Sequence, residues 1–308
     1  MKIVTVTLNP AFDLHCYADS FKPYHENIFA VTAMDAGGKG INVSRALMAV
    51  GAKSRAVCVV GRENGAEFIE RLSEQGLSVV PVYAEGRIRE NITLHERSKP
   101  ETRISFQGFS ASEELLAEVR TAVGALSAGD VCVFAGSAPK GISEEALVSF
   151  LFLLKANGAR LVIDSRSVSL GAMQRLRPFL IKPNKEEAEG ALGISIESLA
   201  DAKRAAEALQ AQGIENVLLS LGAEGAVLAT DAEALYANAP RITPLSTIGA
   251  GDSTLAGYLS ALVAENPPRE CLARAIAFGS AACLSEGTAP PRLEDAMRLL
   301  SEVKVEKL

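Results

Sequence analysis

The sequence has little of what marks several large classes of protein. No apolar run reaches the roughly 18 residues that a membrane-spanning helix requires. The amino-terminal stretch MKIVTVTLNP is too short and too poorly patterned for a secretory signal. The net charge of −6 at pH 7 provides no basic surplus to neutralise the phosphates of a nucleic acid. We therefore expect a cytoplasmic chain that binds neither a membrane nor a nucleic acid.

Cysteine and histidine are scarce and widely spaced. The five cysteines form no C-x-x-C pair, and the three histidines form no H-x-x-x-H pair. This pattern argues against a disulfide framework or a zinc site and favours free thiols in a reducing compartment. A Walker A sequence and a complete G-x-G-x-x-G sequence are also missing, which excludes the two commonest nucleotide-binding loops.

The apolar pattern predicts an α/β fold. Hydrophobic residues make up 48% of the 308 positions and charged residues 22%, which suits a large buried core. Short runs rich in Val and Ile alternate with helical patterns, as in a mostly parallel central sheet covered on both faces by helices, a three-layer αβα sandwich. No linker rich in Pro, Gly or Ser divides the chain, so we expect a single domain over residues 1–308.

Individual elements follow from the same pattern. The predicted strands are 2–8, 55–60, 130–135, 160–164, 179–182, 216–221 and 226–230. The predicted helices are 41–50, 65–75, 112–126, 143–156, 198–212, 253–264, 269–285 and 293–302. Residues 13–34 and 82–109 break the order and look like irregular or alternating strands; in the second, polar and apolar residues alternate as in a half-exposed sheet. We expect these two segments to meet as a small β-sheet lid over one end of the domain.

Glycines and unusual polar residues cluster just after the predicted strands. Examples are NPAFD after the first strand, GSAPKG at 136–141, KPNKEE at 182–187 and SLGAEG at 220–225. Ligands bind outside the carboxyl ends of the strands in open parallel sheets, and these ends share one edge. The clusters therefore predict one binding site along that edge.

The stretch Gly-Ala-Gly-Asp at 249–252 stands directly before an apolar-periodic helix. Glycines let successive main-chain N–H groups approach one anion, and a helix amino terminus adds free donors and a positive dipole end. An aspartate beside such donors suits phosphoryl transfer, in which a carboxylate takes the proton of the acceptor hydroxyl. The dipole is expected to keep Asp252 ionised. The alternative is a tight turn with Asp252 as an ordinary N-cap.

A second glycine-rich stretch, AGGKGINVSRAL, spans residues 36–47. Gly37 and Gly38 allow the backbone to approach a ligand closely. Lys39 supplies a cation, and Asn42 is placed to bind hydroxyl groups from the first helical turn. This stretch therefore predicts contacts with a polar, anionic ligand.

Asn184 and Glu187 lie three residues apart at a predicted helix start in IKPNKEEAEGAL. An amide and a carboxylate on one face suit a hydrated Mg²⁺, a hard ion that keeps several waters. The alternative is an acidic helix start that the dipole favours without any metal.

Six stretches together resemble the ribokinase-like (PfkB) sugar kinases over essentially the whole chain. They are TLNPAFD, AGGKGINVSRAL, AGSAPKG, KPNKEE, SLGAEGA and STIGAGDSTLAGYL, in the family's order and approximate spacing. TLNPAFD with GGKGINV is most similar to the phosphosugar branch of 1-phosphofructokinases, tagatose-6-phosphate kinases and the minor bacterial 6-phosphofructokinase. The resemblance implies a ribokinase-like fold, ATP and Mg²⁺ as cofactors, and a homodimer joined through the lid.

The resemblance also implies roles for single residues. Asp252 matches the catalytic base, and Gly249, Ala250 and Gly251 match the anion hole. The positions that match substrate contacts are Asp13, Gly37, Gly38, Lys39, Asn42, Arg89, Asn91, Arg103 and Ser137, among which Lys39, Arg89 and Ser137 match the pocket for the phosphate already on the sugar. The positions that match ATP contacts are Lys182, Asn184, Ser220, Gly222, Gly225 and Ser246, and Asn184 with Glu187 matches the element that organises Mg²⁺ through water.

The lid departs from the pattern of typical 1-phosphofructokinases. RIRENITL keeps Arg89 and Asn91 but adds the negative charge of Glu90, and ETRISFQG places Arg103 where an acid is typical. These features are closer to the 6-phosphofructokinase lid, whereas Lys39 favours the 1-phosphate and tagatose enzymes. The substrate among these phosphosugars is therefore open at this point.

The leading hypothesis is an ATP-dependent kinase that converts fructose 1-phosphate to fructose 1,6-bisphosphate at its free primary hydroxyl. Tagatose-6-phosphate kinase and 6-phosphofructokinase are the alternatives within the branch. A kinase of a neutral sugar or nucleoside leaves the cations Lys39, Arg89 and Arg103 without a partner. A non-catalytic binding protein has no need of the intact Asp252.

Overall fold

The computed structural model describes residues 1–97 and 101–308, which form a larger and a smaller sheet. Across the larger sheet the strands are, in order, β14 (Val305–Lys307), β13 (Ala234–Ala237), β12 (Ala226–Ala229), β11 (Asn216–Ser220), β10 (Leu180–Ile181), β9 (Arg160–Asp164), β8 (Val131–Ala135), β1 (Ile3–Thr7), β4 (Arg55–Gly61) and β5 (Val79–Ala84). Across the smaller sheet they are β3 (Ala30–Gly37), β2 (Ala11–Ala18), β6 (Arg89–Glu96) and β7 (Thr102–Ile104).

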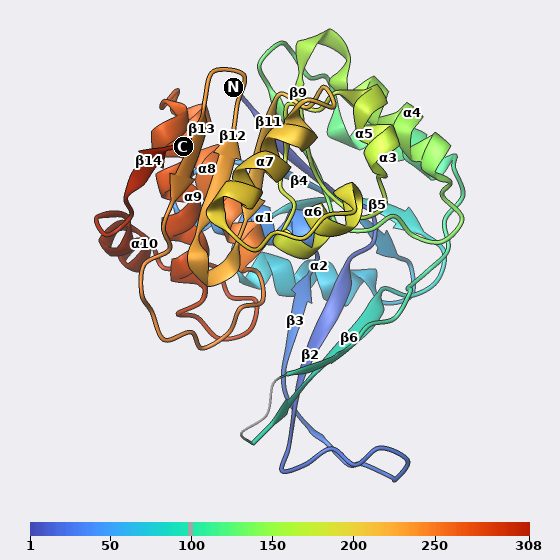
Figure 1. Cartoon of the computed structure of the whole chain (residues 1–308). Helices are drawn as coiled ribbons and strands as arrows, with labels where there is room; N and C mark the ends of the chain where they lie inside the picture. The colour runs from blue at the N-terminus through green and yellow to red at the C-terminus, as the bar shows by residue number, and fades with distance from the viewer. Residues whose placement is uncertain (98–100) are drawn as a thin grey trace.

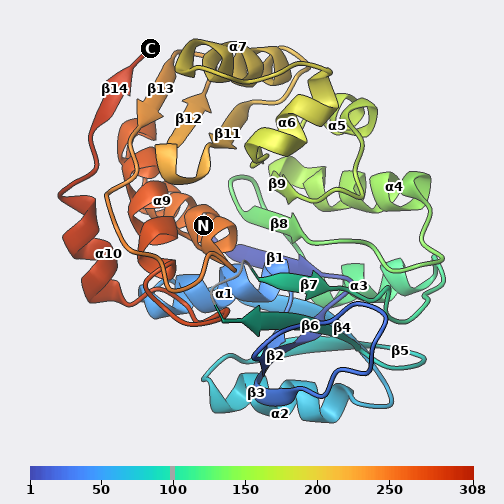
Figure 2. The ribbon, with the colours of Figure 1, turned by 60° about the horizontal axis from the view of Figure 1, so that its bottom comes forward.

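The helices cover the larger sheet on both faces (Figure 1). They are α1 (Lys39–Ala49), α2 (Gly65–Glu74), α3 (Leu115–Val123), α4 (Glu144–Lys155), α5 (Leu170–Leu176), α6 (Lys185–Leu192), α7 (Leu199–Gln210), α8 (Ala250–Val263), α9 (Pro268–Ala282) and α10 (Leu293–Leu300). Figure 2 shows α4 to α7 on one side of the sheet and α1 and α9 on the other. In the described part of the chain, no helix is long and apolar enough to cross a membrane.

The buried strands explain why both faces need helices. β8 has the sequence VCVFA, and successive side chains along a strand point to opposite faces. Phe134 therefore packs in one hydrophobic core and Val133 in the other. From β11 to β5 all neighbouring strands pair in parallel, whereas β12, β13 and β14 pair antiparallel at one edge. The predicted three-layer fold with a mostly parallel sheet is confirmed.

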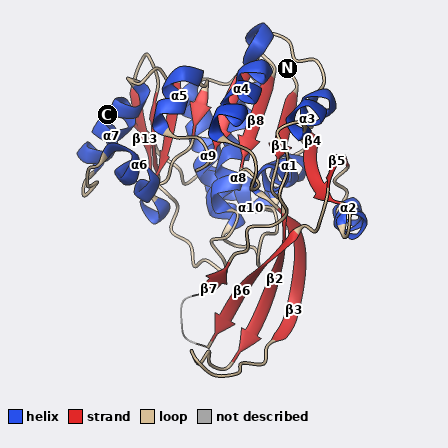
Figure 3. Cartoon of the chain, turned by 90° about the vertical axis from the view of Figure 1, so that its right-hand side faces the viewer, coloured by secondary structure: helices blue, strands red, loops and turns tan. Residues whose placement is uncertain are grey.

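The smaller sheet projects from the body of the molecule (Figure 3). β2 pairs antiparallel with β3 and in parallel with β6, and β6 pairs antiparallel with β7. The two segments expected to form a lid, 13–34 and 82–109, overlap these strands, but their limits differ. Val82–Ala84 belongs to β5 of the larger sheet, and residues 98–100 lie outside the described residues. The division into one domain with an inserted lid stays a prediction.

Candidate active site

A cleft of about 670 Å³ runs between the smaller sheet and the carboxyl ends of the larger sheet's strands. Most of the predicted site residues line it: Asp13, Gly38, Lys39, Asn42, Arg89, Asn91, Arg103, Ser137, Lys182, Asn184, Glu187, Ser220, Gly249, Gly251 and Asp252. Among the described residues that were predicted for the site, the lining does not include Gly37, Ala250, Gly222, Gly225 or Ser246. Segments from the whole length of the chain thus meet in one place.

The amino terminus of α8 presents Asp252 to this cleft. Gly249 is the N-cap residue and has a left-handed backbone, with φ of 76°, a conformation that glycine adopts without strain. Asp252 lies inside the first turn, so it is not the N-cap of the alternative interpretation. The N–H of Ala250 donates to Thr247 at 3.3 Å. In the described part of the chain no acceptor faces the N–H of Gly251 or Asp252, so these two donors are free for an anion.

Asp252 is buried, with 6% of its surface exposed. Burial raises the pKa of its carboxyl group to about 6, the negative charge of Asp164 acts in the same direction, and Lys39, Asn42 and Lys182 oppose the shift. Loss of water around the carboxylate thus works against the ionised form that was expected for Asp252. A pKa near 6 still leaves the group mostly ionised at neutral pH, and it suits a general base.

Lys39 and Lys182 share one buried carboxylate. Asp164 ends β9, and its Oδ1 lies 2.7 Å from Lys39 Nζ while its Oδ2 lies 3.3 Å from Lys182 Nζ. Burial opposes the charge on Asp164, but the two lysines outweigh it and hold the pKa of the carboxyl below its ordinary value. Gly251 makes room for this arrangement, because a Cβ there would lie 3.1 Å from Lys182 Nζ. Two cations against one anion leave a net positive charge beside Asp252.

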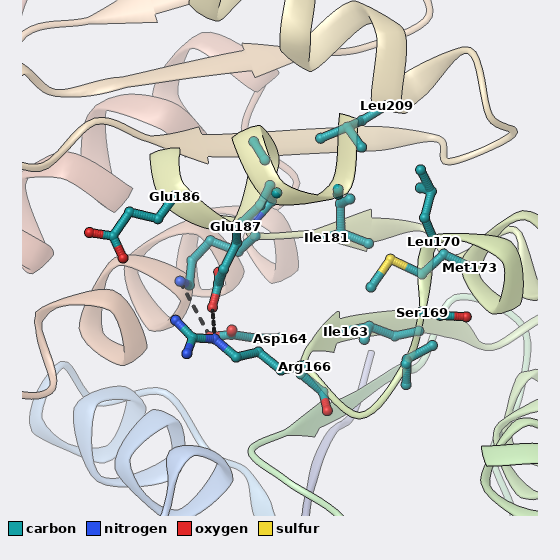
Figure 4. A pocket seen from close by; sticks show the side chains of 17 residues that line it. Ile163, Asp164, Arg166, Ser169, Leu170, Met173, Ile181, Glu186, Glu187 and Leu209 are labelled. Carbon is teal, nitrogen blue, oxygen red and sulfur yellow. Dashed lines mark hydrogen bonds and ion pairs between the residues drawn. The ribbon is translucent and has the colours of Figure 1, made fainter. Parts of the chain in front are cut away.

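Asn184 and Glu187 form a capping box at the start of α6. The Asn184 side chain accepts from the N–H of Glu187 at 2.8 Å, and the Glu187 carboxylate accepts from the N–H of Asn184 at 3.0 Å. The second carboxylate oxygen of Glu187 accepts from Arg166 Nε at 2.8 Å (Figure 4). Burial opposes ionisation of Glu187, yet these hydrogen bonds hold its pKa below the ordinary value. Both residues therefore have a structural role whether or not a metal binds.

The opposite end of the cleft is formed by the smaller sheet. Asp13 on β2 and Asn91 on β6 are paired in register, and Asn91 Nδ2 donates to Asp13 Oδ1 at 3.0 Å. Arg103 lies 3.9 Å from the same carboxylate. Arg89 donates to three main-chain carbonyls, those of Asn9, Pro10 and Phe106. Burial lowers the pKa of Arg89, and the positive charge of Arg103 lowers it further, so this end of the cleft places two guanidinium groups close to each other.

The loop after β11 was predicted to contact the nucleotide. Ser220 lines the cleft and donates from its N–H to Pro183 at 3.0 Å. Gly225 has φ of 107°, and a Cβ there would lie 1.9 Å from the carbonyl oxygen of Ala237, so only glycine fits. Ser246 is buried, and its hydroxyl accepts from the N–H of Ile248. Gly225 and Ser246 thus shape the loops behind the cleft.

Some residues of the site were not predicted. Asp164 and Arg166 lie at and just after the end of β9, and the rule that ligands gather after parallel strands marks that position without assigning a role. Arg45 was missed although it lies three residues after Asn42, on the same face of α1. Thr288 follows α9 in the sequence, and no motif points to it.

A second cavity, of about 650 Å³, adjoins the cleft beside α5 and α6. Its wall is largely apolar, with Ile163, Leu170 and Met173 visible in Figure 4. It shares Asp164, Arg166, Lys182 and Glu187 with the cleft, so the Arg166–Glu187 ion pair stands where the two spaces meet.

The fold and the site together define a class of enzyme. A buried carboxylate beside free main-chain N–H groups and lysine cations, at the carboxyl edge of a parallel sheet, is suited to phosphoryl transfer to a hydroxyl group. The chain belongs to the pfkB family of carbohydrate kinases, whose pattern matches residues 6–296.

Individual relatives are similar over nearly their whole length. A 1-phosphofructokinase of Bacillus subtilis (strain 168) is 33% identical over 306 residues, covering 99% of this chain and 100% of the relative. A 1-phosphofructokinase of Escherichia coli (strain K12) is 32% identical over 282 residues, covering 91% and 90%. The crystal structure of phosphofructokinase-2 from Escherichia coli in complex with substrates and products has a TM-score of 0.91 at 26% identity, covering 98% and 99%.

Proposed function

We propose that this chain is an ATP-dependent kinase of a ketohexose phosphate, with fructose 1-phosphate as substrate and fructose 1,6-bisphosphate as product. The observation that carries the proposal is Asp252: a buried carboxylate with a pKa of about 6, beside free N–H groups at the start of α8. The near full-length similarity to proteins named 1-phosphofructokinase supports the choice of substrate.

In the proposed reaction Asp252 accepts the proton of the sugar's free primary hydroxyl. The oxygen of that hydroxyl forms a bond to the γ-phosphorus of ATP, the bond from this phosphorus to the bridging oxygen breaks, and ADP leaves. The N–H groups of Gly251 and Asp252 donate to the transferring phosphoryl group, whose negative charge they stabilise without rearrangement. Lys182 and Arg166 supply positive charge on the nucleotide side.

The phosphate already on the sugar is proposed to bind at the lid end of the cleft. Arg89 and Arg103 repel each other there, and a phosphate dianion between them would replace that repulsion with charge-assisted hydrogen bonds. Asp13 and Asn91 lie beside them for the sugar hydroxyls. Lys39 was predicted for the same phosphate; its contact with Asp164 also places it within the group of charges around Asp252.

Magnesium belongs to the proposal as the partner of ATP. Within residues 1–97 and 101–308, no cluster of three or more His, Cys, Asp or Glu side chains is suited to hold a metal. Glu187 already accepts hydrogen bonds on both oxygens. These groups fit an ion that arrives with the nucleotide and keeps most of its waters, which Asn184 and Glu187 would contact. When bound, such an ion neutralises charge on the phosphates.

We also propose a homodimer joined through the smaller sheet. Its described residues expose large apolar side chains, among them Tyr17, Val31 and Ile104, and a second copy would cover them. Val31→Asp should convert a dimer to a monomer in light scattering. Phe152→Asp, at an equally exposed apolar position on α4, is the control and should leave the mass unchanged. A monomeric unmodified protein contradicts this part of the proposal.

The free thiols of all five cysteines support the cytoplasm as the compartment.

The test of the substrate is a coupled assay of ATP consumption against fructose 1-phosphate, fructose 6-phosphate, tagatose 6-phosphate, ribose and fructose. The highest kcat/KM is expected for fructose 1-phosphate. A preference for fructose 6-phosphate would favour 6-phosphofructokinase, an alternative supported by the similarity to the Escherichia coli phosphofructokinase-2 solved with fructose-6-phosphate. Highest efficiency on ribose or fructose would contradict the roles of Arg89 and Arg103.

A further inference from the structure

Arg45 is buried behind the site, with 3% of its surface exposed. Its terminal nitrogens face two groups of acceptors. Nη2 donates to Asn42 Oδ1 at 2.8 Å and to the carbonyl and hydroxyl of Thr288, both at 3.1 Å. Nη1 donates to Gln75 Oε1 at 2.9 Å. A guanidinium held this way cannot reach substrate, so it acts on the site through its hydrogen-bonded neighbours and through its positive charge, which interacts with Asp252.

The chemistry of arginine fixes the direction of every hydrogen bond around it. A guanidinium has donors only, so the Asn42 atom that meets Arg45 must be the carbonyl oxygen. The amide nitrogen of Asn42 must then point the other way, and it donates to Asp252 Oδ2 at 2.8 Å. Thr288 obeys the same rule: its hydroxyl accepts from Arg45, so its hydrogen goes to Asp35 Oδ2 at 3.1 Å.

We propose that Arg45 is a positioning residue that locks the Asn42 amide so that its NH₂ group faces Asp252. This role rests on the proposed function of Asp252 as the base. Without Arg45 the amide is free to turn over and set its oxygen against the carboxylate. The amide oxygen and the carboxylate oxygen would then repel each other unless Asp252 carries a proton. A protonated Asp252 cannot accept the proton of the substrate hydroxyl. Arg45 therefore keeps the base in the form that reacts.

The same arginine ties the base to the smaller sheet. Asp35 lies on β3, and His15 Nε2 of β2 is 3.5 Å from Asp35 Oδ2. The path from Asp252 through Asn42, Arg45 and Thr288 thus ends on the lid strands. Arg45 thus connects α1 to the loop at Thr288, and Thr288 connects that loop to β3.

Other charged groups also face Asp252, and the test must leave them in place. Lys39 comes from α1, Asp164 from the end of β9, and Lys182 from the residue after β10. The predicted effect of changing Arg45 is therefore a displacement of the titration of Asp252 and not its removal.

The experiment compares Arg45→Met, which keeps an apolar stem without donors, with Gln75→Leu, which removes only the acceptor of Nη1. In Arg45→Met the acid limb of the kcat–pH profile should move up by about one to two pH units, the value of a lost hydrogen bond to a carboxylate. The KM for ATP should stay within about twofold. Gln75→Leu should lower stability but leave the limb where it is. Arg45→Lys, which still donates to Asn42, should restore most of the wild-type profile.

If Arg45 has a purely structural role, Arg45→Met and Gln75→Leu should both lose stability and both keep the wild-type pH profile. That result would overturn the proposal. Asn42→Leu separates the donor from the charge of Arg45 and also replaces Arg45→Met if that variant does not fold. It keeps Arg45 and adds no charge, but it offers Asp252 no donor, so the acid limb should move up as well, and an unmoved limb again overturns the proposal.

A second readout needs no substrate and separates this proposal from the proposed function. The titration of Asp252 is followed as the pH dependence of the difference in unfolding free energy between the unmodified chain and its Asp252→Asn variant. The upper midpoint of that dependence should rise when both chains also carry Arg45→Met. If it rises while no phosphosugar is consumed, the positioning stands and the proposed function fails. If it does not rise in an enzyme that phosphorylates fructose 1-phosphate, only the positioning fails.

Discussion

Replacing Asp252 by Asn should stabilise the protein while it removes the proposed base. The folded-state pKa lies at about 6 against an ordinary value of 3.8, a rise of about two units that corresponds to about 3 kcal/mol at roughly 1.4 kcal/mol per unit. Because the pKa is raised on folding, the ionised group weakens the fold. This cost is absent below pH 3.8, grows between 3.8 and 6, and is complete above. The amide that Asp252→Asn introduces carries no charge and can still accept from Asn42.

Urea unfolding of the two proteins at pH 8 and pH 5 measures the effect. Asp252→Asn should be more stable by about 3 kcal/mol at pH 8 and by about half of that at pH 5, where part of the carboxylate is already protonated in the folded state. The same variant should lose about 10²- to 10⁴-fold in kcat. Asp201→Asn is the control of opposite sign, because a hydrogen bond from Ser198 lowers the pKa of Asp201. A less stable Asp252→Asn protein, or a difference that does not shrink at pH 5, would refute the reasoning.

Three further changes test other parts of the site. Gly225→Ala should unfold the loop or abolish nucleotide binding, because its Cβ would lie 1.9 Å from a carbonyl oxygen. Gly222→Ala has no atom within 4 Å of the new Cβ and should cost only about 1–2 kcal/mol of stability for its positive φ. Thermal unfolding of both variants measures the difference. Lys182→Met should destabilise the protein by about 3–5 kcal/mol, because it leaves the buried Asp164 with one cation. Adding Asp164→Asn to this variant should recover stability but not activity. Urea unfolding measures the stability, and the coupled assay measures the activity. Arg166→Ala should change the unfolding free energy by less than about 1 kcal/mol because the side chain is 73% exposed, yet it should raise the KM for ATP; an unchanged KM excludes Arg166 from the nucleotide phosphates.

The position of the site could be predicted from the sequence because it depends on one rule of topology. The carboxyl ends of parallel strands meet at one edge, so polar residues placed after separate strands must gather there. Lys182 and Ser220 illustrate this, since each stands at the end of a different strand and both line the cleft. Only the order of the elements is needed, and the apolar pattern supplied that order.

The contacts within the site could not be predicted in the same way. Asn42 was expected to face a ligand and lines the cleft, but its hydrogen bonds with Arg45 and Asp252 were not predicted. A list of polar residues does not say which of them satisfy one another, because that depends on distances between segments far apart in the sequence. The raised pKa of Asp252 could not be predicted for a related reason: the sequence shows the helix start, but it does not show how much water the neighbouring segments exclude.

The edge strand β5 shows a different limit of prediction from the sequence. Its sequence VVPVYA contains Pro81, which weakens a strand pattern because proline lacks an N–H donor. Proline is tolerated at a sheet edge, where one side of the strand has no partner, and β5 occupies that place. Local pattern alone does not reveal which strand will lie at an edge, and Val82–Ala84, assigned to the predicted lid segment, belongs to β5.

The hydrogen bonds around the proposed base join early and late parts of the sequence. Asn42 and Asp252 are 210 positions apart, and Arg45 and Thr288 are 243 positions apart. Synthesis must therefore have passed Thr288 before the last of these partners is present. A chain that ends before Thr288 can pair its early strands, but it lacks the carbonyl and hydroxyl groups that accept from Arg45 behind the proposed base.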